Sequence, residues 1–238
     1  MKNQIADFID DLRSSHGKGL VSVILYGPAA GRDIARQRSE YTTLVTLEKI
    51  GPGELLRAHA AVREWTRLGY PVPVYFTVSE LKDAADVFPI EFSGMKAVRK
   101  VLHGADVLAD LEFSSTNLRH QVEYELRSKL IGLRRAYIPA SSTAQGLVTL
   151  MTESLPNLTV IFGAVLMLQD VNPPGTKREV LALTAERLAI DGTSFEKVLN
   201  IRENNFTETL DEVKANKLFA EYIGQIEKVI DAVNAIEH

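Results

Sequence analysis

The sequence contains no cysteine, which excludes disulfide frameworks, thiolate metal centres and cysteine nucleophiles. Its five histidines are scattered, and none lies in a metal-binding spacing such as His-Glu-x-x-His. Neither a Gly-x-Ser-x-Gly nucleophile elbow nor a Gly-Lys-Ser/Thr phosphate loop occurs. The histidines are therefore expected to be ordinary surface or core residues.

Long apolar segments are also lacking. The longest covers residues 158–168 and is too short to cross a bilayer, which needs roughly 20 such residues. The N-terminus has no apolar core of the kind that a signal peptide carries. We therefore expect a cytoplasmic protein with no membrane partner, in which residues 158–168 form a buried core helix.

An excess of basic residues is absent too, since the formal net charge is -4 and the pI is about 5.8. This balance argues against a general nucleic-acid-binding role. Apolar residues make up 45% and charged residues 24%, as in ordinary globular proteins. With 238 residues, the chain can form one large domain or two of ordinary size.

The first half of the chain alternates between β-rich and helical patterns. Branched and aromatic residues predict strands over residues 21–26, 41–47, 72–78 and 88–92, with a helix over 54–68. The second half is helical by its apolar spacing, with helices predicted over residues 117–138, 143–169, 178–190, 194–201 and 213–236. Pro156 is expected to kink or split the second of these. The fold class is therefore α+β: an α/β-type domain over residues 1–114 and an all-helical bundle over 115–238.

Two short segments carry a family resemblance. Residues 25–33 (LYGPAAGRD) and 39–45 (SEYTTLV) resemble the nucleotidyltransferase signature, in which a strand ends in Gly-Ser and the next strand opens with Ser-Asp-x-Asp. The helical half resembles the C-terminal bundle of aminoglycoside-type nucleotidyltransferases. Residues 86–92 and 101–104 are similar to uncharacterised bacterial proteins with this domain pair. The resemblance implies a mixed sheet followed by a bundle, with ATP and Mg²⁺ as cofactors if the protein is active.

The residues that would hold metal depart from that signature. Two acids at positions i and i+2 of a strand point to one face and can grip two divalent ions roughly 4 Å apart. Glu40 occupies the first acid position, but Thr42 occupies the second, and residues 74–78 lack the third acid. Glu91, on the next predicted strand, is the remaining candidate for that role. Glu40 is then the only remnant of a metal site, and we expect no cofactor.

Four residues near the turn are candidates for binding phosphate: Gly27, Pro28, Arg32 and Arg38, with Arg36 between the two arginines. Pro28 replaces the signature serine and removes both its hydroxyl and an N–H donor. A strand-to-helix turn needs glycine in any case, and an arginine-rich loop is commonly just exposed. The binding assignment and these simpler explanations both stay open.

Three hypotheses follow. The first is a catalytically inactive nucleotidyltransferase-fold protein that acts as a binding or regulatory module, with a nucleotide or small ligand between its halves. The second is an active Mg²⁺-dependent enzyme that moves a nucleotidyl group from ATP to a small hydroxylated acceptor, using Glu40, Glu91 and Gly27. The third is a structural protein whose cleft is filled by Tyr41 and Tyr75. Spare apolar helix faces leave a homodimer open as well.

Overall fold

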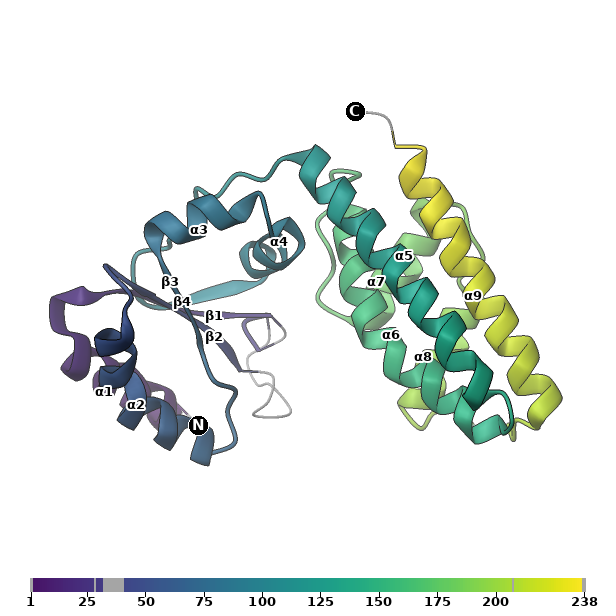
Figure 1. The fold of residues 1–238 in the computed structure, drawn as a ribbon, viewed down its shortest axis with the longest axis horizontal. Helices are drawn as coiled ribbons and strands as arrows, with labels where there is room; N and C mark the ends of the chain where they lie inside the picture. The colour runs from purple at the N-terminus through teal and green to yellow at the C-terminus, as the bar shows by residue number, and fades with distance from the viewer. Residues whose placement is uncertain (1, 28, 32–40, 207, 237–238) are drawn as a thin grey trace. The chain divides into compact units, whose positions relative to one another are not determined.

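The computed structural model describes residues 2–27, 29–31, 41–206 and 208–236. The chain divides into two compact units, Met1–Phe113 and Ser114–His238 (Figure 1). The first unit holds a four-stranded mixed sheet with helices, and the second is built from helices alone in its described part. The α+β class predicted from the sequence is confirmed.

The sheet of the first unit is built around its first strand. Strand order is β3-β2-β1-β4. The strands are β1 (Leu20–Tyr26), β2 (Thr42–Leu47), β3 (Val74–Thr77) and β4 (Arg99–Gly104). Strand β1 pairs antiparallel with both β2 and β4, and β3 runs parallel to β2. A strand that is buried on both faces needs apolar residues throughout, which explains the LVSVILY sequence of β1.

Helices cover the sheet on both faces (Figure 1). One face packs against α1 (Lys2–His16) and α2 (Pro52–Arg67), where Trp65 stacks on Phe8 and on Tyr70 at ring-centroid distances of 4.4 and 3.9 Å. The other face packs against α3 (Val78–Ala85) and α4 (Pro89–Ala97). Because side chains alternate along a strand, β1, β2 and β3 each contribute to both cores.

Two strand predictions in this unit need correction. The strand predicted over residues 88–92 is wrong, because Pro89 instead opens helix α4, where its missing N–H leaves no hydrogen bond unmade. The third strand ends at Thr77 and not at Val78. Thr77 caps α3: its hydroxyl accepts from the Glu80 N–H at 3.1 Å, and its own N–H donates to Glu80 Oε2 at 2.7 Å.

The second unit contains five described helices, as its apolar spacing predicts. They are α5 (Ser115–Ala140), α6 (Ala144–Met167), α7 (Lys177–Arg187), α8 (Thr193–Arg202) and α9 (Glu212–Asn234). Helix α6 is the described helix that is long and apolar enough to cross a membrane. Its apolar window is 56% buried inside the protein, as expected for the core helix of a bundle.

The predicted split of α6 at Pro156 is wrong, because the helix runs through the proline. Proline has no N–H to donate to the carbonyl four residues earlier, which belongs to Thr152. Arg202, the last residue of α8, donates to that carbonyl oxygen from Nη1 at 2.8 Å. A neighbouring helix therefore satisfies the acceptor that the proline leaves unpaired.

Gly104 at the end of β4 provides a test of this sheet geometry. Its φ is +73°, and a Cβ there would lie 2.0 Å from the Val21 carbonyl oxygen. We expect Gly104→Ala to destabilise the first unit by more than about 2 kcal/mol, because both the backbone conformation and the strand spacing must change. Gly53→Ala is the control, since Gly53 lies in α2 with open space around it. The measurement is thermal denaturation monitored by tryptophan fluorescence. Equal melting temperatures for the two variants would contradict the prediction.

Candidate functional site

The end of β1 forms the corner that the signature motif predicts as a site. Tyr26 pairs with Thr42 of β2 on one side and with Arg99 of β4 on the other. The next residue, Gly27, has a φ of +74°, which glycine adopts without strain. Its N–H donates to the Val98 carbonyl at 2.9 Å, and its carbonyl accepts from the Ala30 N–H at 2.9 Å. Gly27 thus shapes a tight turn, and its own N–H is already used within the protein.

Thr42, at the second acid position, makes a structural hydrogen bond. Its Oγ1 donates to the Tyr26 carbonyl oxygen at 2.7 Å. A hydroxyl can donate there, whereas an ionised carboxylate would bring a negative charge against the same oxygen. The position that holds a metal ligand in the signature is here suited to a donor and fastens β2 to the corner.

The sheet face that Thr42 shares is apolar. Alternation places Leu44 on this face, in a core cluster with Ile24 and Phe92. On β3, the residues that pack against the same cluster are Val74 and Phe76. The third acid would have to come from one of these β3 positions. Across the described ranges, no three Asp, Glu or His side chains are placed to hold one metal ion.

Of the other predicted site residues, Glu91 lies within the described part of the chain. It is exposed in the first turn of α4 and not on a strand, so its predicted placement on the sheet is wrong. The remaining candidates, Pro28, Arg32, Arg36, Arg38 and Glu40, lie outside the described residues. Their assigned roles in binding phosphate or metal stay predictions.

Sequence reasoning missed two cations near the corner. Arg99 donates to Asp106 from Nε at 3.0 Å and from Nη2 at 2.8 Å, and also to the Lys96 carbonyl from Nη1. The Arg99 guanidinium holds the pKa of the Asp106 carboxyl below its usual value. Lys96 Nζ donates to the Leu111 carbonyl at 2.7 Å. Both cations therefore have structural partners within the protein. The Arg99–Asp106 pair could have been suspected from its spacing of seven residues, whereas no sequence signal points to the contact of Lys96.

The two tyrosines that were predicted to fill a cleft belong to the core under α1 and α2. Tyr41 is 7% exposed, and its ring meets Tyr70 edge to face at 5.6 Å. Tyr75 is half-buried and packs against the same cluster from β3. Burial raises the pKa of the Tyr75 phenol to about 12. Both rings thus contribute to packing within the first unit.

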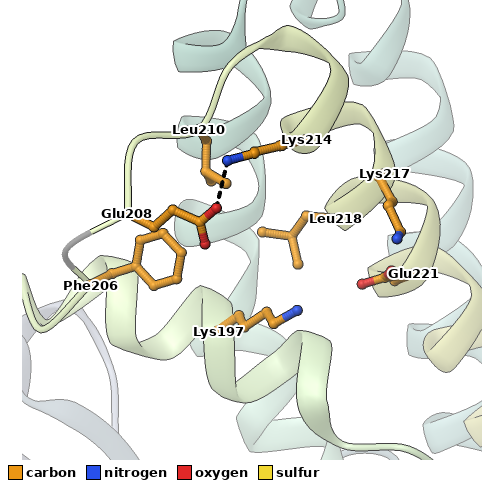
Figure 2. Close-up of a pocket in the computed structure, with 8 residues that line it drawn as sticks. All are labelled: Lys197, Phe206, Glu208, Leu210, Lys214, Lys217, Leu218 and Glu221. Atoms are coloured by element: carbon orange, nitrogen blue, oxygen red, sulfur yellow. Dashed lines mark hydrogen bonds and ion pairs between the residues drawn. The ribbon is translucent and has the colours of Figure 1, made fainter.

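A cavity of about 220 Å³ in the helical unit brings three lysines together (Figure 2). Lys214 pairs with Glu208 at 2.7 Å, which raises the pKa of the lysine and lowers that of the glutamate. Figure 2 shows that Lys197 and Lys217 lie around the same space, with Glu221 beside them. The lysines come from α8 and α9, so no short motif could reveal the cluster. The ammonium groups of Lys197 and Lys217 and the apolar lining residues Phe206, Leu210 and Leu218 suit a small anion with a flat or apolar part.

The fold is similar to that of a solved nucleotidyltransferase. One such match is spectinomycin adenyltransferase AAD(9) from Enterococcus faecialis, in a crystal structure with ATP and spectinomycin. The TM-score is 0.57 at 11% identity, and the alignment covers 98% of this chain and 99% of that one. The sequence matches no protein-family model and no curated protein. At this identity the likeness shows a nucleotidyltransferase-like fold.

The hydroxyl of Thr42 can be tested against its neighbour on β2. We expect Thr42→Val to lower the free energy of unfolding by about 1 kcal/mol, because the Tyr26 carbonyl loses its donor. The control is Thr43→Val, since Thr43 is 2% exposed and its Oγ1 has no partner among the described residues. That variant should be neutral or more stable by up to about 2 kcal/mol. Urea unfolding measures both, and equal losses would contradict the assignment.

Proposed function

We propose that this protein is a nucleotidyltransferase-fold binding module that takes up a nucleotide or a similar small anion without two-metal catalysis. The observation that carries the proposal is the structural use of the acid positions. Thr42 donates its hydroxyl to the Tyr26 carbonyl, and the corresponding face of β3 presents Val74 and Phe76. Two-metal transfer depends on carboxylates that bridge and neutralise the ions, and neither a hydroxyl nor an apolar side chain can replace them.

Nucleotides are the first ligands to test. The protein of similar fold was solved with ATP, so that protein's ligand is a rational starting point for this chain. Two groups of cations are available for phosphate: the arginines at positions 32 and 38, and the cavity lysines Lys197 and Lys217. Ammonium and guanidinium groups bind phosphate oxygens without a metal ion, so binding would survive chelation of Mg²⁺.

The rival hypothesis is an active Mg²⁺-dependent nucleotidyltransferase. It requires Glu40 to act with a second acid, such as Glu91, near one ion. The two hypotheses differ in what metal does to ligand binding. In a two-metal enzyme the ions bridge protein and phosphates, so nucleotide affinity falls when Mg²⁺ or Glu40 is removed.

The deciding measurement is the melting temperature with ATP, in Mg²⁺ or in EDTA, for the wild type and Glu40→Ala. We expect ATP at about 100 times its Kd to stabilise the fold by about 2.7 kcal/mol in all four conditions. A shift that needs both Mg²⁺ and Glu40 would establish the enzyme instead. No shift with ATP, GTP, CTP or UTP would remove nucleotides as ligands and favour a structural role.

Variants then locate the nucleotide. The double variant Lys197→Ala and Lys217→Ala removes cations from the helical cavity, and Arg32→Ala with Arg38→Ala removes them from the sequence segment between β1 and β2. Lys228→Ala, an exposed lysine of α9 outside the cavity, is the control. Loss of the ATP-induced shift in one double variant alone assigns the site.

A further inference from the structure

A second cavity lies in the first unit, between α2 and the edge strand β3. It has a volume of about 460 Å³, within the roughly 300–1,000 Å³ typical of small-molecule sites. Leu55 and Val62 of α2 line it together with Val72 and Tyr75 from the β3 segment. Val72 is 66% exposed and Leu55 is 45% exposed. An apolar recess of this size is therefore open to solvent beside the sheet edge.

The rim of this groove is basic. Helix α2 carries three arginines, and two of them have ion-pair partners on the same helix: Arg57 pairs with Glu54 at 2.8 Å, and Arg67 pairs with Glu64 at 2.6 Å. Arg63 forms no ion pair within the described ranges, and it lines the groove. His59, one turn earlier on α2, lines it as well. A guanidinium that forms no ion pair within the described ranges thus borders an apolar recess.

A third feature inside the groove is the Tyr75 side chain. Its phenol oxygen is buried and has no hydrogen-bond partner among the described residues. Because that oxygen is closed off from solvent, a ligand in the groove would contact the accessible part of the ring and not the hydroxyl. Burial raises the pKa of this phenol to about 12, so the ring stays neutral at neutral pH and adds no negative charge to the groove.

We propose that this groove binds a small amphipathic carboxylate. The apolar part of the ligand lies against Leu55, Val62 and Val72, and the carboxylate faces Arg63 with His59 beside it. Removal of apolar surface from water stabilises the bound ligand, and charge complementarity with Arg63 selects an anion over a cation or an alcohol. This site is separate from the proposed nucleotide sites, so the two proposals can fail independently.

An added peptide strand is the main competing occupant, because β3 is an edge strand. Two prolines oppose it: Pro71 and Pro73 lie directly before Val74 and have no N–H to donate to a new strand. The paired length of β3 is only Val74–Thr77. The geometry therefore favours a small molecule over strand addition.

The test uses decanoate as the probe, below its micelle concentration, in isothermal titration calorimetry of the full chain. We expect one equivalent to bind, and Arg63→Glu to weaken binding about tenfold or more. Lys18→Glu makes the same charge change at an exposed residue of the first unit that does not line the groove, and it should leave the Kd within about twofold. Both Arg63 and Lys18 are exposed, so circular dichroism should show an unchanged fold for each variant.

The only tryptophan reports the location. Trp65 Nε1 donates to the Pro71 carbonyl at 2.9 Å, next to Val72 in the groove wall. Decanoate should change its fluorescence with the same midpoint as the calorimetry, whereas decylamine should not. The proposal is overturned if neither signal responds, if several equivalents bind, or if Arg63→Glu and Lys18→Glu weaken binding equally. An acidic peptide that binds while decanoate does not would also overturn it.

Discussion

The fold of the first unit depends on strand β1 being hydrogen-bonded along both edges. Its neighbours β2 and β4 pair with it along its length, with one register shift in each pairing, and its side chains enter both core clusters. The end of this strand, at Tyr26 and Gly27, therefore fixes where β2 begins and where β4 begins. The corner corresponding to the nucleotidyltransferase signature is a direct product of that pairing. Its backbone is held in place by the pairing of β2 and β4 with β1 and by the Gly27 N–H, which donates to the Val98 carbonyl.

The residues at this corner also stabilise the first unit. Carboxylates on one sheet face repel each other and resist burial unless metal ions neutralise them. Here Thr42 donates to a backbone carbonyl, and Val74 and Phe76 on the neighbouring strand extend the apolar core. Ring contact between Phe76 and Phe92, at 5.4 Å, is part of the same core. The described part of this sheet face is therefore a packing surface.

Sequence patterns predicted the α+β class, the first two strands and the five helices of the second unit, because each has strong apolar periodicity. They failed for β4, whose residues Arg99, Lys100 and His103 are polar and whose position at the sheet edge leaves one side without a strand partner. They also failed at Pro89, where the same proline is compatible with a strand start or a helix start.

The candidate site was harder to predict than the fold. The absence of paired acids at positions 42 and 74–78 is visible in the sequence, but the Thr42 hydrogen bond to Tyr26 depends on strand register. The clustering of the cavity lysines and the position of the basic rim beside the apolar groove likewise depend on which helices and strands lie side by side. No local spacing shows that Arg63 lacks the ion pair that Arg57 and Arg67 have.

The contact between Arg202 and the Thr152 carbonyl has a consequence for biosynthesis. Helix α6 leaves the ribosome before α8, so a nascent chain that ends after α6 carries a mid-helix carbonyl whose partner has not yet been made. Water satisfies that oxygen until α8 has been made, and Arg202 then takes the place of that water in a bond that stays exposed to solvent. The turn at Pro156 can therefore form before α8 exists, and the arrival of Arg202 adds a fixed contact between the two helices.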